Sequence, residues 1–524
     1  MRSARTLREL LRAAAHDAPD ADAFRYRDEQ LTYRDWDVLA DRLAAGLAAH
    51  GVGHGSVVAL LLPSTPLYLI AYLGAAGLGA VTTGLNVRYR RSEIGHVLQR
   101  SGARLLLAVD RWHDVDFRRI VESVRGELPE LREVLWLDAA DLQRSTAGVV
   151  DSLGAPTATA AAVDPDDPAA IVFTSGTTGA PKGACYTHAS LLAVADIEAR
   201  RHPDGLPRFQ KHLAPGLSFA HVGTMTRIAV QIANLGSSLI HDTFDVRAIL
   251  AAIERERLTH LGGIPTQLIA LLDHPDRARR DLSSLRSVLV GGAPAAPSLI
   301  RRIQDELGAE VSVRYSSTEV GIATASVAGD SPEVVATTVG RATPGVELRI
   351  VDEGNHPLPV GATGEVVVRS PATMREYWRD PDATAATIDA GGWVHTGDLG
   401  HLDAANYLHL TGRRSEMYIR GGFNVHPGEV EERLGQHPKV ARAAVVGVPH
   451  ATLGEVGWAF VVPCDPAEPP TLAELRAFVG DELASFKRPD GLTLLDDVPL
   501  TPMFKVDRRA LRMLMEDAPS PAQV

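Results

Sequence analysis

In the N-terminal third of the chain, helix-like and strand-like apolar patterns alternate. Apolar residues recur with helical spacing over 6–15, 35–50 and 67–79, whereas short continuous apolar runs cover 57–62, 105–109 and 134–137. Runs of the second kind are typical of buried strands. Their alternation with helices predicts an α/β architecture.

The most apolar stretch, 57–83, is interrupted by Pro63 and Pro66 and by three glycines. These breaks favour a buried strand, a turn and a core helix over a membrane-spanning helix. The N-terminal segment carries charges throughout and predicts an amphipathic helix, not a secretory signal. We therefore expect no membrane span.

Further along the chain, 145–165 is rich in Ala, Gly, Thr and Pro and predicts a loop. Helix and strand patterns resume over 247–290, and 350–370 predicts short strands joined by Gly/Pro turns, as in a small β-barrel or sheet. A boundary is expected at 411–416, followed by a compact α+β domain. The predicted domains are residues 1–414 and 415–524.

Composition narrows the class of protein. Apolar residues make up 45% and charged residues 23% of the chain, as in ordinary globular proteins, and the net charge is −12. The negative charge argues against a nucleic-acid-binding surface. Cys185 and Cys464 are the only cysteines. They form no disulfide framework, which predicts a cytoplasmic location.

Lysine is rare in this chain. Of 53 basic residues only five are lysine: Lys182, Lys211, Lys439, Lys487 and Lys505. Because arginine serves as the general surface cation, a retained lysine is a candidate for a task that needs a compact ammonium group.

A hydroxyl- and glycine-rich loop follows the apolar triplet 171–173. Its members are Thr174, Ser175, Gly176, Thr177, Thr178, Gly179 and Lys182. Backbone N–H groups, hydroxyls and an ammonium group gathered in one loop suit a polyphosphate. The spacing of the glycines and the lysine is not that of the common P-loop.

This run resembles, at every position, the phosphate loop of the adenylate-forming superfamily, which includes acyl-CoA synthetases, and the resemblance extends from Leu31 to Lys505. It implies two stacked αβαβα sheets plus a small β-barrel, and a mobile α+β C-terminal cap. It also implies that a carboxylate and ATP give acyl-AMP and pyrophosphate, after which a thiol attacks. The implied cofactors are ATP, Mg²⁺ and coenzyme A.

The segment 315–319 resembles the aromatic-Gly-x-Thr-Glu motif of this superfamily. The resemblance implies that Tyr315 stacks on adenine, that Thr318 contacts the α-phosphate and that Glu319 holds Mg²⁺. Ser317 occupies the variable position. Ser316 replaces the usual Gly beside the acyl pocket, so its bulk and hydroxyl argue against a long straight acyl chain.

Two more segments match nucleotide-binding parts of the family. Gly292, Ala293 and Pro294 resemble the loop that recognises adenine. Asp398 and Arg413 match the two ribose ligands, and an ionised carboxylate suits hydrogen bonds from ribose hydroxyls.

The remaining matches concern the acid and the thiol. Lys505 matches the lysine that bridges the acyl carboxylate and the α-phosphate, and Phe504 stands where relatives usually carry Gly. His221 matches the gate of the acyl pocket. Gly421 and Gly422 match the loop that lines the thiol tunnel. The usual hinge Asp or Lys is replaced by Ser415.

The leading hypothesis is an ATP-dependent acyl-CoA synthetase for a hydrophobic carboxylic acid, a small-molecule substrate. The segment 217–223 has no Asp of the kind that pairs with an amino-acid substrate, and Ser316 favours a bulky, polycyclic terpenoid- or steroid-like acid. One alternative passes the acyl group to a carrier protein or a separate thiolation partner. Another is a nucleotide-binding scaffold without chemistry. The resemblance leaves room for a homodimer.

Overall fold

The structure, a computed structural model, describes residues 4–153, 162–174, 181–202, 206–215, 218–293, 295–502 and 504–516. By the density of internal contacts the chain divides into two units. The first unit contains the described parts of Met1–Thr174, Ala180–Leu348 and Val368–Val394. The second contains the described parts of Arg349–Val367 and His395–Val524.

A seven-stranded sheet lies in the first unit, with the strand order β20-β10-β9-β4-β3-β5-β8. Its central strands are parallel, and β10 is antiparallel to β9 and β20. The strands are β3 (Val57–Leu61), β4 (Val81–Gly84), β5 (Leu105–Val109), β8 (Glu133–Leu137), β9 (Pro168–Phe173), β10 (Gly183–Thr187) and β20 (Glu376–Tyr377).

The helices that accompany this sheet share one apolar core with it. They include α1 (Leu7–Asp17), α2 (Tyr33–Ala49), α3 (Pro66–Gly77), α4 (Arg91–Ser101), α5 (Phe117–Val124), α6 (Ala139–Arg144), α7 (Thr146–Leu153) and α14 (Pro381–Thr387). A short turn η1 (Arg125–Glu127) follows α5, and β6 (Arg111–Trp112) and β7 (Val115–Asp116) form a small hairpin. Helix α3 is buried on all sides, which matches its sequence of almost only apolar residues.

A nine-stranded sheet in the same unit has the order β17-β16-β15-β14-β13-β11-β12-β1-β2. The strands are β1 (Asp22–Tyr26), β2 (Glu29–Thr32), β11 (Lys211–Pro215), β12 (Ser237–His241), β13 (His260–Gly263), β14 (Ser287–Val290), β15 (Glu310–Tyr315), β16 (Thr324–Ala325) and β17 (Arg341–Ala342). Strands β11 to β15 are mutually parallel where they pair.

The two faces of this second sheet differ in polarity. One face buries a set of apolar side chains under α10 (Val246–Glu256), α11 (Pro265–Asp273) and α12 (Pro297–Leu307): Leu213, Leu261, Val288, Val290, Val311 and Val313. Period-2 alternation places His212, His260, Ser312 and Arg314 on the other face. Short helices η2 (Pro275–Arg279) and α13 (Pro332–Thr337) complete this part.

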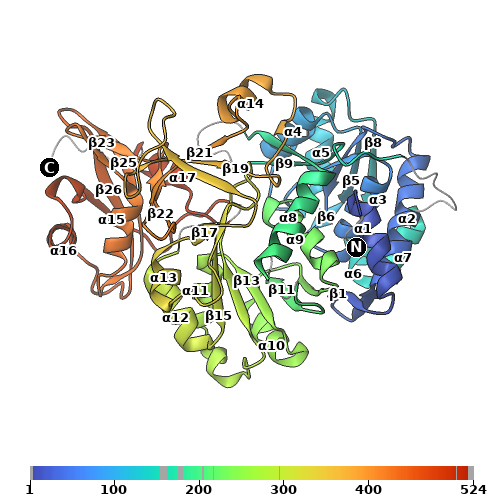
Figure 1. The fold of residues 1–524 in the computed structure, drawn as a ribbon, viewed down its shortest axis with the longest axis horizontal. Helices are drawn as coiled ribbons and strands as arrows, with labels where there is room; N and C mark the ends of the chain where they lie inside the picture. The colour runs from blue at the N-terminus through green and yellow to red at the C-terminus, as the bar shows by residue number, and fades with distance from the viewer. Residues whose placement is uncertain are drawn as a thin grey trace. The chain divides into compact units, whose positions relative to one another are not determined.

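Helices α8 (His188–Arg201) and α9 (Val222–Ala233) lie between the two sheets (Figure 1). Their apolar residues, including Leu191, Met225 and Ile228, join the core of the seven-stranded sheet. Their polar residues meet the polar face of the nine-stranded sheet, because Glu198 bonds Arg314 and Arg227 bonds His212.

The second unit contains two smaller sheets. A four-stranded sheet is formed by β18 (Glu347–Val351), β19 (Gly364–Arg369), β21 (Val394–Leu402) and β22 (Leu408–Arg413). A five-stranded sheet is formed by β23 (Tyr418–Arg420), β24 (Phe423–Val425), β25 (Val440–His450), β26 (Gly454–Pro463) and β27 (Gly491–Leu494). Its helices are α15 (Pro427–Leu434), α16 (Leu472–Gly480), η3 (Ser485–Lys487) and α17 (Arg508–Glu516).

The predicted α/β class is confirmed, as are the two large sheets and the α+β character of the C-terminal part. The strand, turn and core helix expected in 57–83 are β3, a turn and α3. The predicted β-barrel corresponds to the four-stranded sheet, and its closure into a barrel stays a prediction. No described helix is long and apolar enough to cross a membrane.

The loop predicted over 145–165 is wrong in its first half, where α7 forms. Val149 and Val150 are buried in the core, and the carboxylate of Glu29 accepts a hydrogen bond from the backbone N–H of Thr146 at 3.1 Å. The helix is thus stabilised by burial and by a distant acceptor, neither of which local composition reveals.

Candidate active site

The phosphate-loop candidate connects the antiparallel strands β9 and β10. The Thr174 N–H donates to the Lys182 carbonyl at 2.9 Å, and the Lys182 N–H donates to Thr174 Oγ1 at 3.2 Å. These bonds fix both ends of the loop. The five predicted residues between them, Ser175, Gly176, Thr177, Thr178 and Gly179, lie outside the described residues.

Tyr377 connects two candidate residues that are far apart in the sequence. It lies on β20 beside β10, and its hydroxyl donates to Glu319 Oε1 at 2.8 Å. Lys182 Nζ lies 5.1 Å from the centre of the Tyr377 ring. Burial and the charge of Glu319 raise the pKa of Tyr377, so the phenol stays a neutral donor at physiological pH. Sequence reasoning missed this residue, because no local spacing marks it.

The segment 315–319 forms a tight turn at the end of β15. The Ser317 hydroxyl accepts hydrogen bonds from the backbone N–H groups of Glu319 and Val320, each at 3.2 Å. The Tyr186 hydroxyl donates to the Thr318 carbonyl at 2.8 Å. Burial raises the pKa of Tyr186 well above its ordinary value, so this donor also stays neutral. The turn is therefore held rigidly in place.

The adenine-loop candidate follows the neighbouring strand. Gly292 has φ +81°, which favours glycine, and a Cβ there would lie 3.2 Å from Ile264. Because β14 and β15 are parallel neighbours, Gly292 and Ala293 and the turn that begins at Tyr315 emerge at the same edge of the sheet. Ligands bind at this edge in open α/β sheets. Pro294 lies outside the described residues.

His221 caps the N-terminus of α9. Its Nδ1 accepts a hydrogen bond from the Gly223 N–H at 3.3 Å. This contact gives the imidazole a structural role as a helix cap.

Glu319 is the candidate Mg²⁺ ligand. Mg²⁺ is usually held by one or two carboxylates together with phosphate oxygens and water. The donor set fits this pattern, because Glu319 keeps one carboxylate oxygen beyond the one that Tyr377 contacts. Among the described residues, no group of three or more His, Cys, Asp or Glu side chains is arranged to hold a metal ion.

In the second unit, Asp398 and Arg413 are direct partners on β21 and β22. Arg413 Nε donates to Asp398 Oδ1 at 2.7 Å. The Asp398 side chain is 7% exposed and that of Arg413 is 41% exposed. The pair thus presents a fixed carboxylate beside a guanidinium that solvent can reach.

Gly421 and Gly422 form the two-residue turn between β23 and β24, in which Arg420 pairs with Phe423. Their φ angles are +58° and +87°, which glycine adopts without strain. The Gly421 N–H donates to the Leu453 carbonyl at 2.7 Å. The turn is well fixed, and no atom of the described residues lies within 4 Å of a Cβ placed on Gly422.

Lys505 ends a second turn in this unit. The Thr501 N–H donates to the Lys505 carbonyl at 2.7 Å, and the Lys505 N–H donates to Thr501 Oγ1 at 3.2 Å. Phe504 adopts φ +58°, a value that relatives' glycine accepts freely. Three residues later Arg508 pairs with Glu416 and Glu431, which anchors α17.

Comparisons with known proteins match most of the chain and point to one enzyme family. A family described as AMP-binding enzyme matches residues 11–378, and its C-terminal domain family matches residues 429–505. The chain is 36% identical over 524 residues to a 3-[(3aS,4S,7aS)-7a-methyl-1,5-dioxo-octahydro-1H-inden-4-yl]propanoyl:CoA ligase of Rhodococcus jostii, covering 97% of this chain and 98% of that protein.

A ligase of the same name from Mycobacterium tuberculosis is 37% identical over 519 residues, covering 97% of this chain and 99% of that protein. Among solved structures, ATP-bound MatB from Rhodopseudomonas palustris matches with a TM-score of 0.89 and 28% identity, covering 98% and 99% of the two chains. The chain therefore belongs to the AMP-binding enzyme family of the adenylate-forming superfamily and is an ATP-dependent, AMP-forming acid–thiol ligase of the acyl-CoA synthetase type.

Proposed function

We propose that this enzyme converts a ring-bearing hydrophobic carboxylic acid into its CoA thioester by way of acyl-AMP. The observation that carries the proposal is the meeting of Lys182, Tyr377 and Glu319, which gathers a cation, a neutral donor and a carboxylate beside the end of the phosphate-loop candidate. Both curated relatives named above are described as CoA ligases for a propanoyl group on a methylated dioxo-octahydroindene, a bicyclic acid.

In this proposal the first unit binds the triphosphate and adenine. The loop from Thr174 to Lys182 and the turn at Thr318 hold phosphate oxygens, and Glu319 holds Mg²⁺, which supplies positive charge to the phosphates when bound. Tyr315, Gly292 and Ala293 receive adenine. Asp398 and Arg413 receive the ribose hydroxyls.

Lys505 is proposed to offset the repulsion between the acid carboxylate and the α-phosphate in the first half-reaction. An ammonium group suits this task because it acts as a point charge without a fixed plane. Gly421 and Gly422 are proposed to line the path of the pantetheine thiol in the second half-reaction. Replacing Lys505 by the Gly421–Gly422 turn between the two half-reactions would need residues 415–524 to move relative to 1–414.

The proposed acid site lies near His221 and Ser316. Ser316 is exposed at the end of β15, where the hydroxymethyl group takes space that a glycine would leave open. A compact ring on a short chain therefore suits this site better than a long straight chain.

Mass spectrometry of products from a mixed carboxylic-acid library, with ATP and Mg²⁺, tests the proposal. Ring-bearing acids should give acyl-CoA only when CoA is present. Fatty acids turned over far better than ring acids would overturn the substrate class. Acyl-AMP that accumulates in the presence of CoA would instead indicate a carrier protein or another thiolation partner as the acceptor.

A further inference from the structure

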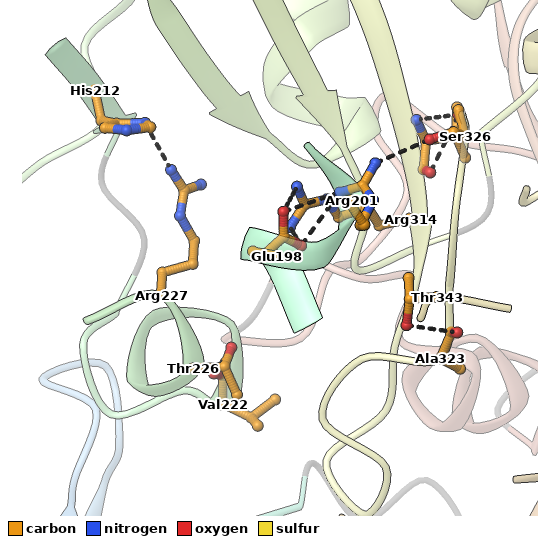
Figure 2. A network of polar contacts seen from close by, with 11 residues as sticks. Glu198, Arg201, His212, Val222, Thr226, Arg227, Arg314, Ala323, Ser326 and Thr343 are labelled. Atoms are coloured by element: carbon orange, nitrogen blue, oxygen red, sulfur yellow. Dashed lines mark hydrogen bonds and ion pairs between the residues drawn. The ribbon is translucent and has the colours of Figure 1, made fainter. Parts of the chain in front are cut away.

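A row of buried charges lies between helices α8 and α9 and the polar face of the nine-stranded sheet (Figure 2). Glu198 is buried and pairs with Arg201 at 2.9 Å and with Arg314 at 2.9 Å. Although burial raises the pKa of Glu198, the charges of Arg314 and Arg201 outweigh burial and lower it. One carboxylate is therefore already shared by two guanidinium groups.

Arg227, on α9, is the third guanidinium of this row, and its hydrogen-bond partner is a histidine instead of a carboxylate. Its Nη2 donates to Nδ1 of His212 at 3.1 Å, and Figure 2 shows the side chain extending from the helix to that imidazole. Among the described residues Arg227 has no ion pair. Burial and the charge of Arg314 lower the pKa of Arg227 to about 10, so it stays charged at neutral pH.

His212 offers Arg227 a neutral acceptor only. A guanidinium has five N–H donors and no acceptor, so the imidazole must present an unprotonated Nδ1. Burial and the charge of Arg227 lower the pKa of His212 well below its usual value, and that of the adjacent His260 falls to about 4. The charge of Glu198 stabilises the Arg227 cation without a direct ion pair among the described residues. A buried guanidinium is still costly unless an oxygen accepts from its remaining N–H groups.

The Arg227 guanidinium packs directly on the backbone of Gly262 in β13. A Cβ built on Gly262 would lie 2.7 Å from Arg227 Nη1, so a larger residue there would displace the guanidinium. Gly262 pairs with Leu289 and Leu289 with Ser312, so all three share the polar face. Arg227, Leu289 and Ser312 all keep some accessible surface. The strand neighbours of Leu289 and Ser312, which point to the opposite face of the sheet, are buried.

This face leads directly to the candidate active site. Two residues beyond Leu289 comes Gly291, at the start of the adenine-loop candidate, and Ser316 follows Ser312 and Arg314 at strand spacing. Along α9, Arg227 comes six residues after His221, a helical rise of about 9 Å. Arg227 therefore lies one short molecule's length from the proposed acid gate.

We propose that Arg227 determines acid specificity by donating hydrogen bonds to an oxygen, of a ketone or a second carboxylate, at the end of the acid remote from the reacting carboxylate. This inference rests on the proposed function. It goes further by requiring an oxygen-bearing group on the acid in addition to the reacting carboxylate, and a ring ketone on the proposed substrate can supply it.

Matched acids test the inference: 3-cyclohexylpropanoic acid, 3-(4-oxocyclohexyl)propanoic acid and 4-(2-carboxyethyl)cyclohexanecarboxylic acid. The wild-type enzyme should prefer at least one of the oxygenated acids by about tenfold or more in kcat/KM, the scale of a hydrogen bond to a charged group. Which one is preferred tells a ketone from a carboxylate. Arg227→Met should abolish that preference, and Arg227→Lys should retain part of it.

Gly262→Ala is a second variant that keeps the charge but crowds the guanidinium, and it should also reduce the preference. Arg201→Met is the matched control, since it removes a carboxylate-paired arginine of the same row and should leave the ratio between acids unchanged. A wild-type enzyme with no preference, or an Arg227→Met change that lowers kcat/KM equally for all three acids, would overturn the inference. Absence of acyl-CoA from every ring-bearing acid, with other acids converted, would contradict the proposed function instead.

Discussion

At the scale of single residues, Tyr377 shows how a side chain outside the motifs can hold two motif residues in place. Its hydroxyl donates to Glu319 and its ring lies beside the Lys182 ammonium. Tyr377→Phe should lower kcat/KM for ATP by about tenfold to a hundredfold, because a hydrogen bond to a charged group is worth about 1.5–3 kcal/mol. The Mg²⁺ concentration needed for half-maximal activity should rise as well.

Tyr72→Phe is the control for that measurement. Tyr72 is fully buried, and its hydroxyl has no partner among the described residues. Its loss should leave steady-state kinetics unchanged. Equal kinetics for the Tyr377→Phe and wild-type enzymes would show that Glu319 is positioned without the phenol.

Lys505 permits a second prediction at this scale. Lys505→Ala should lower acid-dependent pyrophosphate release by about a hundredfold to a thousandfold, the usual effect of removing one preorganised charge from a transition state. Thioester formation from added acyl-AMP should change much less, because that step forms no bond at the α-phosphate. Lys439→Ala, which removes a lysine paired with Glu474 at 3.0 Å, should affect neither step. A parallel loss in both half-reactions would contradict the role proposed for Lys505.

At the scale of elements, the turn that carries Lys505 contains backbone strain at Phe504, with φ +58°. A non-glycine residue in this region costs roughly 1–2 kcal/mol. Phe504→Gly should therefore be more stable than Phe504→Ala by about 1 kcal/mol in urea unfolding, since both lose the ring and only alanine keeps the strain. Equal stability of the two variants would show that the turn relaxes when the ring is removed.

The elements also show what the sequence could and could not predict. The strand and helix within 57–83 were predictable because continuous burial needs a continuous apolar run. Helix α7 was not, because it depends on Glu29, which is 117 residues away. The candidate residues lie in local motifs, so their resemblance to the motifs of the superfamily could single them out as candidates from the sequence alone. Tyr377 and Arg227 act through partners in other elements, and only the folded chain brings these together.

At the scale of the whole molecule, buried histidines make folding sensitive to acid. Burial lowers the pKa of His188 to about 4, while the unfolded chain titrates near its ordinary value of 6.5. Above pH 6.5 the residue is neutral in both states. As the pH falls from 6.5 to 4 only the unfolded state takes up the proton, so stability is lost across this window. The loss amounts to about 1 kcal/mol at pH 5.5 and about 3 kcal/mol below pH 4.

His188→Asn should reduce this sensitivity. His188 Nδ1 accepts a hydrogen bond from the Leu7 N–H at 3.4 Å, and asparagine can place an acceptor there without titrating. The fall in Tm between pH 7.5 and pH 5.5 should be smaller in the variant by about 2 °C, because a large folding unit such as the first one shifts its Tm only slightly per kcal/mol. His16→Asn should change nothing, since that side chain is 90% exposed on the neighbouring helix α1. If His188→Asn and the wild type lose the same Tm on acidification, the acid sensitivity belongs to other groups, and the buried imidazole next to the first helix does not contribute to it.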